Sequence, residues 1–103
     1  MPHGWAIAEV WLLLRDCLLF EDAGRLVLLA GVPPEWFRDE RGMSVNRLAT
    51  EFGLCSFRYA PRREGGGELI LSGEAQPPLG FVLRHPNGDV AAPASAKRIG
   101  VPM

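Results

Sequence analysis

The sequence is poor in the residues that build metal centres and covalent cross-links. Among its 103 residues are two cysteines and two histidines, and no CxxC or similar metal-ligand spacing occurs. Cys17 and Cys55 can form one disulfide at most. Two cysteines without a metal-ligand spacing indicate ordinary reduced thiols in the cytoplasm. We therefore expect no metal, no cofactor and a cytoplasmic location.

An excess of charge of one sign is also lacking. Eleven lysines and arginines stand against twelve aspartates and glutamates, which gives a net charge of −1. Proteins that bind nucleic acid or an anionic membrane carry a basic face. The basic residues that do cluster, Arg58, Arg62 and Arg63, have acidic neighbours such as Glu64. The composition therefore argues against nucleic acid and membrane as partners.

No hydrophobic run has the length or the flanks of a membrane signal. A transmembrane helix needs about 20 largely uncharged residues, and Glu9, Arg15 and Asp16 interrupt the apolar run here. A signal peptide needs a positive start and a small-residue cleavage site, and residues 1–5 (MPHGW) offer neither. We expect this run to be buried against protein.

What the sequence does contain is an N-terminal segment that is apolar on every side. The pattern from His3 to Phe20 (HGWAIAEVWLLLRDCLLF) predicts a helix, which Gly24 ends after Glu21 and Asp22. A helix on the surface of a small domain has one apolar stripe. This helix needs cover on all faces, and a chain of this length has little core to provide it. The segment therefore predicts an interface with another protein surface, or a chain that is the end of something larger.

The remainder of the chain has the pattern of a small β domain. Strands are predicted at residues 25–30, 43–50, 54–60, 68–72 and 81–85, with a helical turn at 34–37, a weak edge strand at 98–101 and otherwise irregular chain after residue 90. The run 54–60 and the run 68–72 flank a glycine-rich loop and predict an antiparallel hairpin. We expect one domain over residues 1–103, with the helix in residues 1–22 and a β-rich accessory domain in residues 25–103. Its fold class is mainly β with one N-terminal α-helix, on which a small antiparallel sheet or sandwich packs.

Few residues of the sequence are candidates for catalysis. Cys17 in the apolar segment and Cys55 on the face of a strand are interpreted as inert buried thiols. Glu9 is an acid among apolar residues, which is costly unless the charge has a partner. We interpret it as paired with a cation or backbone group of a neighbouring element, and the alternative places it at the edge of a ligand site. No second acid can be assigned to it as a glycosidase pair.

Among the aromatic residues, most are expected in the core, because large side chains supply much of the buried area of a small β domain. Trp36 lies in the polar-looking turn PPEWF. It is the best candidate for an exposed platform on which a sugar ring stacks.

Three segments in order resemble the carboxyl-terminal region of bacterial (α/α)6-barrel glycoside hydrolases. They are Pro2–Trp5 (PHGW), Gly31–Trp36 (GVPPEW) and Thr50–Gly53 (TEFG), and the resemblance spans residues 2–85. In those enzymes the last barrel helix precedes a short β-rich domain. Ala49 departs from the pattern, because the family has proline there.

The resemblance implies that the catalytic carboxylates would lie in the barrel, which this sequence lacks. Only His3 and Trp5 would then lie near the barrel mouth. Without barrel helices around them, Trp11, Leu14 and Leu18 need another cover, and self-association is the simplest one.

The main hypothesis is therefore a non-catalytic β-rich accessory or structural domain, a remnant of a carbohydrate-active enzyme. It would associate through its N-terminal helix as a homodimer or with a barrel domain. One alternative is a carbohydrate-binding module that uses Trp36. The other is a small enzyme whose site is shared across a dimer by His3, Glu9 and His85.

Overall fold

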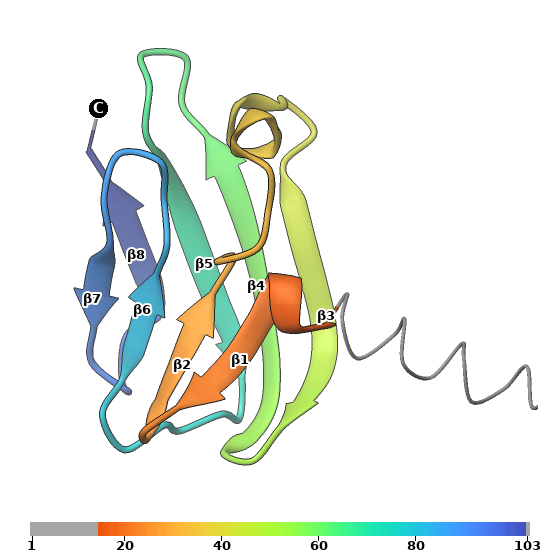
Figure 1. The fold of residues 1–103 in the computed structure, drawn as a ribbon, viewed down its shortest axis with the longest axis vertical. Coiled ribbons are helices and arrows are strands. Elements are labelled where there is room, and N and C mark those ends of the chain that lie inside the picture. The colour runs from red at the N-terminus through yellow and green to blue at the C-terminus, as the bar shows by residue number, and fades with distance from the viewer. Residues whose placement is uncertain (1–14, 103) are drawn as a thin grey trace, which may run out of the picture.

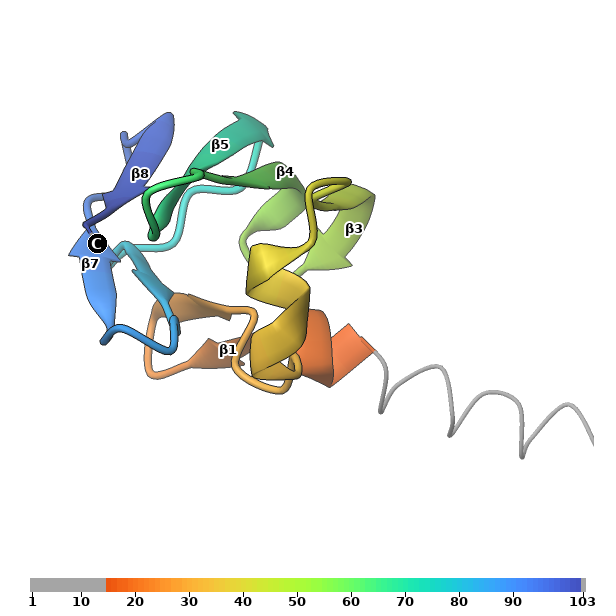
Figure 2. The ribbon, with the colours of Figure 1, turned by 90° about the horizontal axis from the view of Figure 1, so that it is seen from above.

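The structure, a computed structural model, describes residues 15–102 of the chain. Two four-stranded β-sheets pack face to face around one hydrophobic core (Figures 1 and 2). The strands are β1 (Leu19–Asp22), β2 (Arg25–Leu28), β3 (Met43–Thr50), β4 (Gly53–Pro61), β5 (Gly67–Gly73), β6 (Phe81–Leu83), β7 (Val90–Ala92) and β8 (Arg98–Val101), and a 3-10 helix, η1 (Pro34–Arg38), lies between β2 and β3. One sheet has the order β1-β2-β6-β7 and the other the order β3-β4-β5-β8. The mainly β fold class is confirmed.

The alternation of side chains along the strands explains the core. In β4, Cys55, Phe57 and Tyr59 point inward and are buried, while Arg58 between them is exposed. In β2, three successive residues are buried, as expected for a strand covered on both faces. This strand pairs in parallel with β6, whereas the other strand pairs within residues 15–102 are antiparallel. The hairpin of β4 and β5 has the predicted pairing.

The N-terminal helix ends earlier than the apolar pattern predicts. Residues 15–18 are helical, but Leu19–Asp22 form β1, which pairs with β2. Asp22 lies opposite Arg25, so Ala23 and Gly24 form a two-residue hairpin loop with φ of 50° and 86°. Two positive φ values are the geometry of a type I′ turn, which matches the twist of the strands. The predicted helix was therefore wrong at residues 19–22, because hairpin pairing replaces the helical hydrogen bonds there.

The rest of the predicted helix carries several of the expected functional residues. His3, Trp5, Glu9, Trp11 and Leu14 lie outside the residues that the structure describes. Within residues 15–102, no helix is long and apolar enough to cross a membrane.

The C-terminal part is more regular than expected. The predicted edge strand at residues 98–101 is confirmed as β8, but β7 was missed. Its three residues, Val-Ala-Ala, have a weak strand pattern, and they pair with β6 across the turn at residues 84–89. Pairing with a neighbour, rather than local propensity, makes this strand.

Replacing Ala23 by asparagine is expected to stabilise the domain by about 0.5–1 kcal/mol, because asparagine tolerates the left-handed region better than alanine and forms the favoured Asn-Gly turn. Urea denaturation of both proteins measures the difference. Ala30→Asn is the control, since Ala30 is exposed and has no positive φ. A gain in Ala30→Asn equal to that in Ala23→Asn would contradict the turn argument.

Candidate functional site

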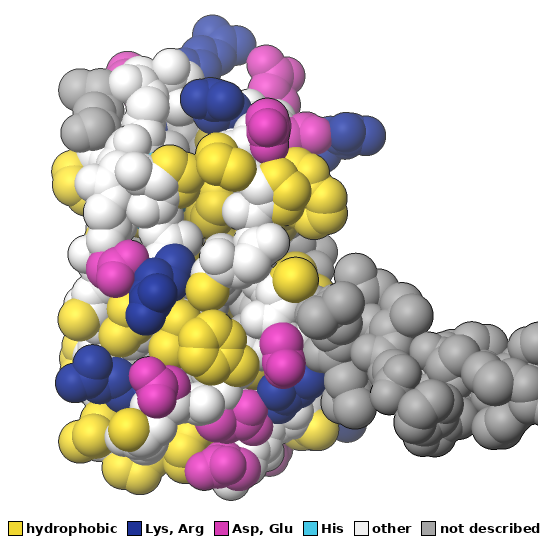
Figure 3. All heavy atoms as spheres, in the orientation of Figure 1, with side chains coloured by type: hydrophobic (Ala, Val, Ile, Leu, Met, Phe, Trp, Pro, Cys, Tyr) yellow, Lys and Arg dark blue, Asp and Glu magenta, His cyan; other side chains and the backbone are white. Residues whose placement is uncertain are grey.

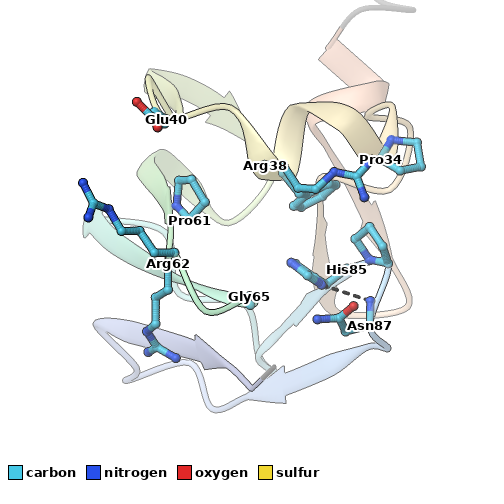
Figure 4. Close-up of a pocket in the computed structure, with 12 residues that line it drawn as sticks. Pro34, Arg38, Glu40, Pro61, Arg62, Gly65, His85 and Asn87 are labelled. Atoms are coloured by element: carbon cyan, nitrogen blue, oxygen red, sulfur yellow. Dashed lines mark hydrogen bonds between the residues drawn. The ribbon is translucent and has the colours of Figure 1, made fainter.

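One end of the sandwich holds a cleft of about 610 Å³ (Figure 4). Three segments form it: η1 with the residues after it, the loop between β4 and β5, and the turn that follows β6. Its apolar lining includes Phe37 and three prolines, and its polar lining includes arginines, Glu40, His85 and Asn87. Both sheets therefore contribute to this cleft, which we call the end cleft.

Three rings pack together where the end cleft meets the core. Phe37 contacts His85 edge-on, with ring centroids 4.8 Å apart, and contacts Tyr59 in the same way at 5.3 Å. The Tyr59 hydroxyl lies 2.8 Å from Nε2 of His85. Phe37 and Tyr59 are buried and His85 is half-buried, so this cluster joins η1, β4 and the turn after β6.

The hydrogen bonds of His85 determine its tautomer. Its Nδ1 accepts the backbone N–H of Asn87 at 3.0 Å, drawn as a dashed line in Figure 4. A neutral ring must then carry its proton on Nε2, which donates to the Tyr59 hydroxyl. Burial lowers the pKa of His85 and raises the pKa of Tyr59, which favours the neutral form of both groups.

This arrangement gives His85 a positioning role. Both ring nitrogens are engaged, and a proton on Nδ1 would face the N–H of Asn87. His85 thus holds the turn at Pro86 and Asn87 against the aromatic cluster. Of the three residues expected to share a site across a dimer, it is the one in the described part of the chain.

A second hollow, of about 420 Å³, lies beside the end of the N-terminal segment. Leu18, Trp36 and Met43 supply its apolar lining. Trp36 is 51% exposed, whereas Leu18 and Met43 are partly buried against the core. The structure therefore brings together an expected platform residue, Trp36, and an expected interface residue, Leu18.

An ion pair that was not expected ties the N-terminal segment to the sandwich. The guanidinium of Arg15 donates to both carboxylate oxygens of Glu21, each at 2.9 Å. It also donates to the carbonyl oxygen of Ala49 at 2.9 Å, and Glu21 accepts the backbone N–H of Glu51 at 3.0 Å. We call these four residues the root clamp, because they join the end of the helix to β1, to β3 and to the turn after β3.

The hydrogen bonds from Arg15 lower the pKa of Glu21 from 4.5 to about 2. The two side chains are only 15% and 21% exposed, so the pair is partly desolvated. The sequence did not reveal this pair because residues six apart do not face each other on a helix. The change from helix to strand after Leu18 brings them together.

The described part of the chain offers neither a reactive thiol nor a metal site. Cys17 and Cys55 are free thiols, and burial raises the pKa of Cys55 to about 11, which agrees with an inert core thiol. Within residues 15–102 no three histidine, cysteine or acidic side chains are grouped so that they could hold a metal ion.

Comparison of the chain with protein-family models, curated proteins and solved structures found no match. The resemblance to the carboxyl-terminal region of (α/α)6-barrel glycoside hydrolases therefore stays a prediction.

Proposed function

We propose that this chain is a non-catalytic β-sandwich accessory domain of the cytoplasm that attaches to a second protein surface through its apolar N-terminal segment. The root clamp is the observation that carries the proposal. An attachment segment positions a domain only if its junction is rigid. Arg15 and Glu21, which belongs to β1, supply a bidentate, charge-assisted pair at this junction. The pair also bonds to Ala49 of β3 and to Glu51 in the turn after it.

The surface beside the root clamp supports the same proposal. Leu18, Trp36 and Met43 extend the apolar character of the segment onto the sandwich. An exposed tryptophan beside apolar side chains is typical of the anchors of protein interfaces. The partner that we propose is a second copy of this chain. A barrel domain, which the resemblance implies, is the other partner to consider.

Light scattering after size-exclusion chromatography tests this proposal on the full chain. We expect a dimer, and we expect the double variant Trp11→Glu/Leu14→Glu to be monomeric with the circular dichroism of the folded sandwich. Trp36→Ala should weaken the dimer. Leu79→Glu is the control, because Leu79 is 62% exposed but lies in the segment between β5 and β6, away from the hollow. A wild-type chain that stays monomeric from micromolar to millimolar concentration would refute self-association.

A carbohydrate-binding module is the second candidate, and the exposure of Trp36 favours it. An indole that is half exposed can stack on the apolar face of a sugar ring. Retention on a polysaccharide affinity gel that is lost in Trp36→Ala would support this function. Absence of retention on a broad set of gels would remove it.

A further inference from the structure

We propose that the end cleft binds a compact organic anion, a molecule with a carboxylate or phosphate group on a body about the size of a sugar ring. The volume is the first observation. About 610 Å³ lies within the range of 300–1,000 Å³ that is usual for small-molecule sites. A bare inorganic ion would leave most of this space unfilled.

The walls of the end cleft are held in place before any ligand binds. Pro34, Pro61 and Pro86 each restrict one of the three segments that form it. The hydrogen bond from Asn87 to His85 fixes the turn after β6. A site with such fixed walls loses little freedom when it binds.

The loop between β4 and β5 forms a second fixed wall. The backbone N–H of Arg62 donates to the carbonyl of Gly66 at 3.2 Å, and that of Gly65 donates to the carbonyl of Arg62 at 3.1 Å. Gly66 has a φ of +67°, and a Cβ there would overlap the carbonyl oxygen of Val101. The backbone of this loop therefore borders the cleft without a side chain at Gly66.

Two guanidiniums give the end cleft its preference for anions. Arg38 and Arg63 are exposed, and neither forms an ion pair with another residue in the described part of the chain. Arg62 differs, because its guanidinium lies 3.3 Å from the carbonyl oxygen of Val101 and 4.0 Å from the carboxylate of Glu68. Glu40 is the one acid that residues 15–102 contribute to the lining. A guanidinium offers the paired donors that match a carboxylate or a phosphate.

The opposite side of the end cleft suits the body of the ligand. Figure 4 shows Arg38 on the η1 side, with His85 and Asn87 across the cleft from it. The imidazole is held neutral, so it contributes a ring surface rather than a positive charge. Nδ2 of Asn87 donates to the carbonyl oxygen of Pro102, which leaves its Oδ1 as an acceptor for a ligand hydroxyl.

Titrations followed in the ¹H–¹⁵N correlation spectrum test the proposal. The probes are glucuronate, glucose 6-phosphate and neutral glucose, which share one ring and differ in the charged group. We expect saturable shifts of the Gly65, Gly66 and Asn87 amides with at least one of the two anions, and weaker binding as salt is added. The first two probes distinguish a carboxylate ligand from a phosphate ligand. Equal binding of glucose, or no shifts with either anion, would overturn the proposal.

Matched variants locate the site. Arg38→Gln/Arg63→Gln should weaken anion binding by about tenfold or more. Arg25→Gln should leave it unchanged, because Arg25 is an exposed arginine beside the β1–β2 turn, at the opposite end of the sandwich (Figure 1). Equal affinity of the double variant and the wild type would also overturn the proposal. The monomeric Trp11→Glu/Leu14→Glu variant should keep the binding, so a failure of the proposed attachment is distinguishable from a failure here.

Discussion

Replacing Gly67 by alanine is expected to destabilise the domain by about 2–3 kcal/mol, because the site is already fully packed. A methyl group at Gly67 would overlap the Tyr59 hydroxyl and lie 2.8 Å from the carbonyl oxygen of Ala60. Tyr59 is completely buried and bonds to His85, so it has no free space into which to move. Urea denaturation measures the loss.

Gly100→Ala is the matched control for this variant. Gly100 lies on β8 opposite Glu68, and a Cβ there would meet only a guanidinium nitrogen of Arg62, at 3.8 Å. We expect a change within about 0.5 kcal/mol. In Gly67→Ala the amide signals of His85 and Asn87 should shift as well, since the aromatic cluster moves. If the stability of Gly67→Ala were unchanged, the close packing of the Tyr59 hydroxyl against Gly67 would be refuted.

Replacing Glu21 by glutamine is expected to cost about 2 kcal/mol at neutral pH, because the partly buried guanidinium of Arg15 loses its bidentate partner and keeps only the exposed carboxylate of Asp16, 3.4 Å away, as a counter-charge. The wild-type carboxylate accepts both bonds of the guanidinium and the N–H of Glu51. The amide of glutamine can accept through one oxygen only. Thermal and urea denaturation both measure the loss. The control is Glu74→Gln, because Glu74 is exposed and forms no ion pair among the described residues.

The pH dependence of this loss has a definite sign. The pKa of Glu21 is about 2 in the folded protein against 4.5 for the free side chain. The unfolded chain therefore binds the proton first as the pH falls, and the stabilisation is present above pH 4.5 and is lost towards pH 2. The difference in stability between wild type and Glu21→Gln should shrink over this window. Arg41 also lowers the pKa of Asp39 to about 2, but this effect is common to both proteins and cancels in the difference. A difference that does not change with pH would contradict the root clamp.

The face of the sandwich drawn in Figure 3 carries a mixture of charged and apolar side chains. Acidic and basic side chains are interspersed with apolar ones over the face in view, with no large area of one sign. This agrees with the balanced composition of the chain. The hollow at Leu18, Trp36 and Met43 and the end cleft are therefore local features, and both border η1, the first through Trp36 and the second through Phe37.

Much of the β architecture could be predicted from local patterns. The alternation in residues 54–60 identified β4 and its inward face, and the glycine-rich loop identified the hairpin with β5. The short apolar run before Gly31 identified β2, because a strand covered on both faces has no polar side. Proline at the start of η1 identified that turn. The exposure expected for Trp36 is also observed.

The sequence by itself determined the class of fold and the buried faces of the main strands, because the two-residue period and the turn residues act over short distances. Only the tertiary structure decided where the N-terminal helix ends and which polar groups meet. Leu19 and Phe20 fit a helix as well as a strand, and pairing with β2 selected the strand. Three features join segments that are far apart in the chain: the root clamp, the contact of Tyr59 with His85 and the end cleft. A local sequence pattern does not predict contacts between residues so far apart.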